Sequence, residues 1–314
     1  MYFVVFALSL IFLLLSANYL VKTTERLSSS VRISPLVIGA TVIALGTSLP
    51  ELSITLSSVL GGASSISLGN IIGSNITNIF LVTGLCILLF PIRIGTTKTQ
   101  KNNLVNLFVT TIFIVTFFLP ATYKTIAIST LGISYLLFFF AEILWGEKDG
   151  RRVDKKILTK LHKSNEKPLT TGIKIIFSIG LLLVSSNYTV LSSLKIAEFF
   201  KLEGEVVALS LVALGTSLPE LITSITSGID RDWKLLVGDV QGSSIFNIGI
   251  LGAATLYFSK DLSLEVNLLP LLYLLASTIF ISFLTRKYEG ETIPRYYGLI
   301  FLGLYSSYLL IIFL

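Results

Sequence analysis

The chain has 314 residues, of which 53% are hydrophobic and only 13% are charged, and its formal net charge is +6. A soluble domain carries about 25% charged residues, so this composition excludes an ordinary soluble protein and indicates a polytopic, all-α membrane protein. The positive charge does not indicate a nucleic-acid partner, because the Lys and Arg residues fall between the apolar runs, as membrane topology requires.

Five apolar runs of membrane-spanning length precede the middle of the chain, and each is expected to form a transmembrane helix. They cover approximately residues 2–21, 35–60, 66–90, 104–119 and 125–145. The first run lacks the basic start of a signal peptide and has a counterpart later in the chain, so we expect it to be a mature helix. Glu142 and Trp145, near the end of the fifth run, are expected at the membrane interface.

A basic polar segment, residues 146–174, follows and is expected to be a solvated cytoplasmic linker between two halves, residues 1–145 and 175–314. The second half again contains five apolar runs, at approximately residues 175–194, 205–229, 235–258, 268–284 and 297–314. Asp239 is interpreted as a residue at the entry of the eighth helix, and Trp233 as an interface anchor.

The two halves repeat each other at a constant offset. Gly46–Glu51 and Gly215–Glu220 are the same six residues, Gly-Thr-Ser-Leu-Pro-Glu, 169 positions apart. The same offset aligns Gly73-Ser74 with Gly242-Ser243 without a gap. Helix two therefore corresponds to helix seven, a shift of five helices. Because five is odd, the second half must cross the membrane in the opposite direction, which is the inverted-topology repeat of many secondary transporters.

The distribution of basic residues supports ten helices with both termini outside the cell. On that layout all but four of the 24 Lys and Arg residues lie on the cytoplasmic side. The positive-inside rule predicts such a bias, and an odd number of helices would spoil it. The expected location is therefore the cell membrane, with several passes.

The repeated hexapeptides are expected to hold a cation. A carboxylate deep in a bilayer needs a partner, and no Lys or Arg lies near Glu51 or Glu220 in the apolar runs that carry them. Helical spacing puts Thr47 and Ser48 on the same face as Glu51, and Thr216 and Ser217 on the same face as Glu220. A bound cation is therefore the best source of the missing positive charge.

Proline is expected to break helices two and seven beside these acids. Pro50 cannot donate a hydrogen bond to the carbonyl of Gly46, and Pro219 cannot donate to Gly215. Such backbone persists at membrane depth only where it is buried in protein or lines a cavity. Carbonyl groups from Ala44 to Gly46, and from Ala213 to Gly215, then become additional oxygen ligands.

The third and eighth helices complete the predicted site. Each carries a serine and an asparagine four residues apart, Ser74 with Asn78 and Ser243 with Asn247. Carboxylate, hydroxyl, amide and carbonyl oxygens suit hard cations such as Ca²⁺ or Na⁺, and suit Mg²⁺ less well. With one Cys (Cys86) and one His (His162), neither a soft-metal site nor a disulfide framework is expected.

The charge of the site suggests exchange. Two carboxylates balance one Ca²⁺, and several Na⁺ can occupy the same oxygens, so we expect a Na⁺/Ca²⁺ antiporter without a cofactor. Three Na⁺ against one Ca²⁺ would carry one net charge per cycle. A Ca²⁺/H⁺ exchanger and, in another class, a cation channel remain alternatives. An enzyme is not expected, since no nucleophile–base pair or metal triad is present.

These motifs resemble the α-repeats of the calcium/cation antiporter superfamily, and the chain is similar to prokaryotic sodium/calcium exchangers along essentially its whole length. The resemblance implies that two helices, one and six, slide across the other eight, and that the protein works as a monomer. It also implies a full ligand set, namely Ala44, Thr47, Ser48, Glu51, Ser74, Asn78, Ala213, Thr216, Ser217, Glu220, Ser243 and Asn247. Asn247 departs from the best-known prokaryotic pattern, which has Asp there.

Simpler interpretations exist for each of these residues. A single Ser or Thr in a membrane helix usually bonds its own backbone, and a buried Glu can be a protonated structural acid. Duplication at a constant offset favours the ligand interpretation.

Overall fold

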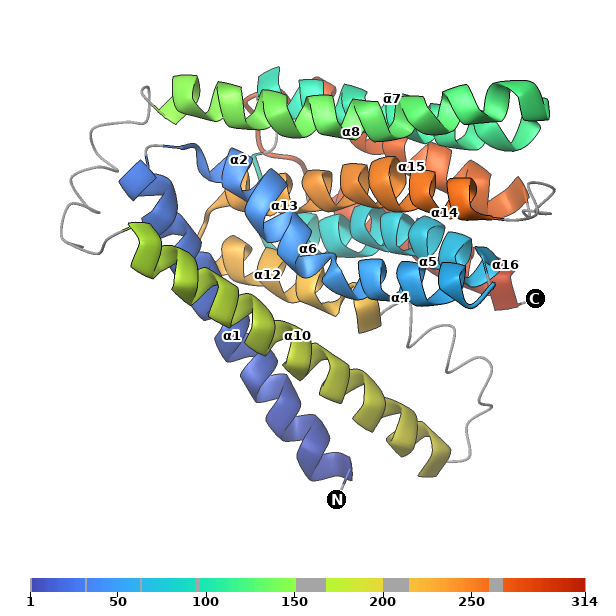
Figure 1. The fold of residues 1–314 in the computed structure, drawn as a ribbon. Helices are drawn as coiled ribbons and strands as arrows, with labels where there is room; N and C mark the ends of the chain where they lie inside the picture. Colours follow the sequence, from blue (N-terminus) through green and yellow to red (C-terminus); the bar gives the residue numbers. More distant parts are fainter. Residues whose placement is uncertain are drawn as a thin grey trace.

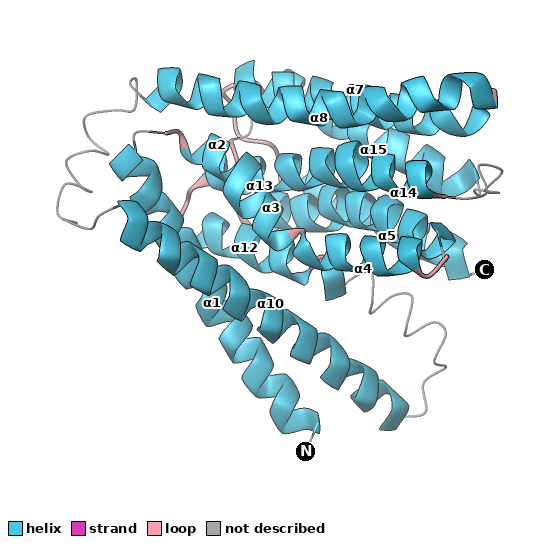
Figure 2. Cartoon of the chain, in the orientation of Figure 1, coloured by secondary structure: helices cyan, strands magenta, loops and turns pink. Residues whose placement is uncertain are grey.

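The computed structural model describes residues 2–31, 33–62, 64–93, 97–150, 168–199, 215–259 and 268–313. Its regular elements in these ranges are all helices (Figure 2). The prediction of an all-helical protein is therefore confirmed for the described residues. Residues 151–167, which include most of the predicted linker and His162, lie outside them.

The described part of the first half contains ten helical segments. They are α1 (Tyr2–Val31), α2 (Pro35–Ile38), η1 (Gly39–Ile43), α3 (Ala44–Thr47), α4 (Leu49–Leu60), α5 (Ser64–Ile76), η2 (Thr77–Thr83), α6 (Gly84–Leu89), α7 (Thr97–Phe118) and, closing the half, α8 (Ala121–Gly150). The segments labelled η are π-helical turns, and they join neighbouring α-helical segments without a loop.

The described part of the second half follows the same order. It comprises α10 (Pro168–Phe199), α12 (Leu218–Ile229), α13 (Trp233–Phe246), η3 (Asn247–Gly252), α14 (Ala253–Phe258), α15 (Leu268–Lys287) and α16 (Tyr296–Phe313). The beginning of the predicted seventh helix, up to residue 214, lies outside the described residues.

Several of these helices are long and apolar enough to cross a membrane. Within the described ranges seven satisfy this condition, and eight do if the bent pair Pro35–Thr47 and Leu49–Leu60 counts as one. A further apolar helix, Tyr296–Leu310, is shorter. The protein is thus a multi-pass membrane protein, while the count of ten stays a prediction.

Two long helices stand apart from the rest. α1 and α10 lie side by side and run obliquely to the other helices, projecting beyond them at the N-terminal end of α1 (Figure 1). They share a separate apolar cluster that includes Leu13, Leu20 and Leu182. Thr189 of α10 also donates a hydrogen bond to Ser9 of α1 over 3.0 Å. This pair touches the remaining helices mainly along α12 and the segment from α2 to α3.

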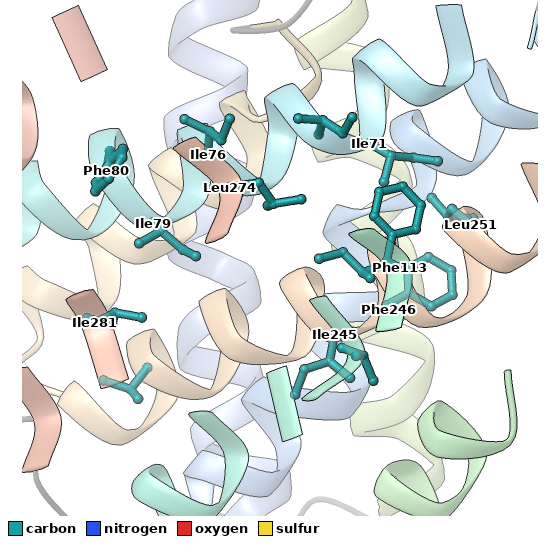
Figure 3. Close-up of a cluster of buried hydrophobic side chains, with 14 of the residues drawn as sticks. Ile71, Ile76, Ile79, Phe80, Phe113, Ile245, Phe246, Leu251, Leu274 and Ile281 are labelled. Carbon is teal, nitrogen blue, oxygen red and sulfur yellow. The ribbon is translucent and has the colours of Figure 1, made fainter. Parts of the chain in front are cut away.

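The main core is built from both halves of the chain. Figure 3 shows Ile71 and Phe80 of the α5–η2 helix, Phe113 of α7, and Ile245 of α13 within one cluster of buried side chains. The free thiol of Cys86 is buried in the same cluster. Side chains of both halves therefore pack together in one core.

Glycines bring α13 unusually close to the α2–η1 segment. A Cβ atom added at Gly238 would lie 2.3 Å from the carbonyl oxygen of Leu36, and one at Gly242 would lie 2.4 Å from that of Ala40. Glycines four residues apart allow this backbone approach, as in other membrane helix pairs. The contact fixes the depth of α13 against the helix that carries Thr47 and Glu51.

Gly242→Ala is therefore expected to lower the stability of the folded protein by about 1–3 kcal/mol or more, because the added methyl group meets backbone atoms that cannot turn aside. Thermal unfolding of the detergent-solubilised protein measures the effect. Gly303→Ala is the matched control, since no heavy atom lies within 4 Å of a Cβ built at Gly303. Equal unfolding temperatures for the two variants would contradict the close contact.

The π-helical turns repeat with the same offset as the sequence. η2 covers Thr77–Thr83 and η3 covers Asn247–Gly252, so each includes the asparagine of its half, Asn78 or Asn247. Thr83 donates a hydrogen bond to the carbonyl oxygen of Asn78, five residues earlier, over 3.0 Å. π-helical turns are rare and often mark functional sites. Their recurrence at Asn78 and Asn247 is therefore consistent with a functional role for these two positions.

Glu142, which was predicted at the membrane interface, is paired with a basic residue of a neighbouring helix. Its side chain is buried, and Lys98 Nζ of α7 lies 2.7 Å from its Oε2 atom. The same face of α7 continues with Asn103, which donates to Thr285 over 2.7 Å and accepts from Gln241 over 2.7 Å. The acid is buried because α7 supplies a basic partner, which a reading of α8 alone could not reveal.

Candidate functional site

The backbone has similar, non-helical ψ angles at the same position of both hexapeptides. The backbone at Ser48, between α3 and α4, has φ −83° and ψ 11°, and Ser217, before α12, has φ −86° and ψ 5°. The helix axis bends by 44° between Pro35–Thr47 and Leu49–Leu60. Proline two residues after each serine lacks the N–H that would continue the ladder, which explains why the interruption falls here.

The carbonyl groups beside these interruptions find different partners. The Gly215 oxygen, which Pro219 leaves without a donor, accepts from Ser186 of α10 over 3.2 Å. The Ala44 oxygen accepts from the backbone N–H of Ser48 over 3.1 Å and lies 3.5 Å from Ser243 Oγ. Ala44 thus faces the predicted site. Ala213 lies outside the described residues.

The two glutamates are contacted from both halves of the chain. Ser48 of the first half donates to Glu220 Oε1 over 3.1 Å, and Ser243 lies 3.5 Å from the same atom. Ser74 lies 3.3 Å from Glu51 Oε1 and 3.5 Å from Thr216 Oγ1 of the second half. The predicted ligands therefore converge from α3, α4, α5, α12 and α13.

Several fully buried polar atoms in this region have no hydrogen-bond partner among the described residues. They are Glu51 Oε2, Glu220 Oε2, Ser217 Oγ, and both amide atoms of Asn78 and of Asn247. Buried polar groups are nearly always paired, because leaving one unpaired is costly. A set of such atoms around two carboxylates is what a binding site for a positively charged ligand requires.

No described Lys or Arg forms an ion pair with either glutamate, and the buried pair that the structure does describe joins Lys98 to Glu142. The oxygen–oxygen separations also fit a cation. Oxygens bound about 2.4 Å from an octahedral Ca²⁺ lie about 3.4 Å apart. The contacts around Glu51 and Glu220 span 3.1–3.5 Å, which is long for hydroxyl hydrogen bonds.

Asp239 does not lie at a helix entry, and that interpretation was wrong. α13 begins at Trp233, and Asp232 caps it by accepting from the backbone N–H of Leu235 over 3.1 Å. Asp239 lies mid-helix with 2% of its surface exposed. Its carboxylate accepts from Thr47 over 3.2 Å and from Thr223 over 2.7 Å. The missed signal was its spacing of four from Ser243 and eight from Asn247, which puts all three on one helix face.

Comparison with known proteins identifies the family. The family model described as "Sodium/calcium exchanger protein" matches residues 1–145 and 172–314, which is most of the chain. The chain belongs to the sodium/calcium exchanger family. As a family member it is a cation antiporter that handles Ca²⁺ and Na⁺, and not an enzyme.

Individual relatives of the exchanger agree with this assignment. This chain is 28% identical to the sodium/calcium exchanger MaX1 of Methanosarcina acetivorans, over 99% of this chain and 98% of the relative. It is 31% identical to the putative antiporter CaxA of Alkalimonas amylolytica, over 79% of this chain and 78% of the relative.

A solved structure has the same fold as the exchanger. The sodium-calcium exchanger NCX_Mj, soaked with Na⁺ and Ca²⁺, superimposes with a TM-score of 0.82 and 28% identity, over 98% of this chain and 96% of that one. The likeness extends through the helices that carry both hexapeptides. The predicted family and transport class are thereby confirmed.

Proposed function

We propose that this exchanger moves Ca²⁺ against Na⁺ by alternating access, through one site centred on Glu51 and Glu220 at the middle of the membrane. The observation that carries the proposal is the convergence of two buried carboxylates with hydroxyl oxygens from both halves and with the Ala44 carbonyl oxygen. Ca²⁺ accepts six to eight such oxygens, and Na⁺ is also a hard cation. The proposed ligands are the twelve residues named from the sequence, with Ala213 included by symmetry.

The proposed architecture is ten helices in two inverted repeats, with helices two and seven broken and both termini outside the cell. The recurrence of the interruptions at Ser48 and Ser217, and of η2 and η3, at one offset supports the repeat. An inverted repeat places equivalent ligands on opposite sides of a site near the bilayer midplane. The linker, residues 146–174, is then cytoplasmic, and one copy of the chain contains the complete site.

α1 and α10 are proposed to move against the remaining helices during transport. They form their own apolar cluster and lie obliquely across the broken helices (Figure 1). α10 also touches both hexapeptides. Ser186 donates to Gly215, and a Cβ atom at Gly46 would lie 2.5 Å from Ile179 Cδ1. Movement of this pair would therefore be coupled directly to the backbone beside each carboxylate.

Proteoliposomes loaded with Na⁺ and diluted into Na⁺-free medium containing ⁴⁵Ca²⁺ are expected to accumulate Ca²⁺. Because three Na⁺ leaving for one Ca²⁺ entering removes one net positive charge, an inside-positive potential should accelerate uptake. Uptake driven by a pH gradient without Na⁺ would instead identify a Ca²⁺/H⁺ exchanger. Flux without any counter-ion would identify a channel.

A further inference from the structure

Asp239 is a third buried acid beside the proposed site. It shares one face of α13 with Ser243 and Asn247, and 2% of its surface is exposed. Each oxygen of its carboxylate accepts a hydrogen bond from one hydroxyl group. Oδ1 lies 3.2 Å from Thr47 Oγ1, and Oδ2 lies 2.7 Å from Thr223 Oγ1. One of these donors, Thr47, belongs to the first hexapeptide and is a proposed ligand.

The acid does not form a cluster of metal-binding acids with the two glutamates. Among the described residues, no group of three or more His, Cys, Asp or Glu side chains is arranged to hold a metal ion jointly. Asp239 is linked to the proposed ligands through its hydrogen bond with Thr47.

The hydroxyl group of Thr47 can serve a cation only if its proton points elsewhere. A threonine hydroxyl has one proton and two lone pairs, and a cation must meet a lone pair. Two acceptors lie near the Thr47 oxygen, namely Asp239 Oδ1 at 3.2 Å and the Ala44 carbonyl oxygen at 3.4 Å. The nearer one belongs to a carboxylate, which is the stronger acceptor. Donation of the Thr47 proton to Asp239, and not to the Ala44 carbonyl, also leaves the Ala44 oxygen available to the site.

The mirrored position in the first half lacks this arrangement. At the offset of 169, Asp239 corresponds to Asn70 and Thr223 to Ile54, whereas Thr47 corresponds to Thr216. The acid and its second hydroxyl donor are therefore both absent from the first half. The amide of Asn70 has no hydrogen-bond partner among the described residues. The two proposed threonine ligands thus differ in the residue at the associated position, which is Asp239 for Thr47 and Asn70 for Thr216.

We propose that Asp239 is a positioning residue that holds the Thr47 hydroxyl with its lone pairs toward the cation, and that it raises the affinity of the site for Ca²⁺. This inference rests on the proposed function. Carboxylates that accept a hydrogen bond from a metal ligand fix the orientation of that ligand and raise its donor strength. Thr223 in turn holds the Asp239 carboxylate in place from the side of α12.

Asp239→Asn tests the proposal, because the amide keeps the size of the side chain and removes the anionic acceptor. The expected result is a 10- to 100-fold increase in the KM for Ca²⁺, with kcat changed less than about threefold. Equilibrium binding of ⁴⁵Ca²⁺ to the detergent-purified protein should weaken by the same factor. Asp232→Asn, at the start of the same helix, is the matched control and should keep both values within twofold.

A double-mutant cycle with Thr47→Val separates positioning from a general effect of charge. If Asp239 acts through the Thr47 hydroxyl, adding Asp239→Asn to Thr47→Val should weaken Ca²⁺ binding by less than about twofold more. Fully multiplicative effects would overturn the positioning role. An unchanged KM and affinity in Asp239→Asn would overturn the proposal altogether, provided thermal unfolding shows that the variant is folded.

The binding measurement also keeps this proposal distinct from the proposed function. Should the unaltered protein bind ⁴⁵Ca²⁺ and yet show no Na⁺-driven uptake, Na⁺/Ca²⁺ exchange would fail while the mutant cycle could still be measured. Uptake in the unaltered protein, together with unchanged binding in Asp239→Asn, would leave the proposed function standing and reject the role of Asp239.

Discussion

Glu220→Gln is expected to reduce Na⁺-driven Ca²⁺ uptake into proteoliposomes by at least about 100-fold, and Glu51→Gln should do the same. Each change replaces an anionic oxygen at the centre of the proposed site with a neutral amide, and charged ligands dominate Ca²⁺ binding. The fold should survive, because Gln keeps the shape of Glu and removes a buried charge that has no basic partner among the described residues.

Thermal unfolding distinguishes loss of the site from loss of the fold. In the unaltered protein, Ca²⁺ is expected to raise the unfolding temperature in a concentration-dependent way, because it binds the folded state. Glu220→Gln should unfold at a similar temperature without Ca²⁺ and lose the Ca²⁺-dependent increase. The exposed Glu291→Gln serves as the control. Normal uptake in Glu220→Gln would mean that the ligands are misassigned.

Lys98→Met is expected to destabilise the folded protein by about 3–5 kcal/mol, because it leaves the carboxylate of Glu142 buried without its positive partner. The two side chains lie 2.7 Å apart and are almost completely buried, so water cannot replace the lysine. Denaturant unfolding of the detergent-solubilised protein measures the loss.

Two further variants make this second result specific. Lys101→Met changes an exposed lysine of the same helix and should alter stability by less than about 0.5 kcal/mol. Adding Glu142→Gln to Lys98→Met should recover part of the loss, since the unpaired charge is then removed. A Lys98→Met protein as stable as Lys101→Met would show that the pair contributes nothing.

Much of the site was predictable because the same hexapeptide occurs in both halves of the chain. Each hexapeptide places a carboxylate and two hydroxyls on one face of a helix broken by proline, and the constant offset links the two copies. If both motifs bind the same cation, their side chains must lie close together. Hydrogen bonds between the halves, such as that from Ser48 to Glu220, are then expected. These features depend on local spacing and on the cost of a carboxylate in a bilayer, and sequence carries both.

Features that depend on pairing between distant helices were not predictable. The ion pair of Glu142 was not foreseen, because its partner Lys98 comes from α7. The acceptor role of Asp239 was missed because it depends on Thr47, nearly 200 residues away in the chain. The π-helical turns were also not predicted, since their residues have no distinctive composition.

The widened turn at Asn78 has a consequence for the polar column along its helix. In a regular α-helix the residue above Asn78 would be Val82, four positions on. The additional residue of the π-helical turn instead brings Thr83 over Asn78, where it bonds the Asn78 carbonyl. The hydrophilic line through Asn70, Ser74 and Asn78 therefore continues to Thr83, one turn farther than an unmodified helix of this sequence would carry it.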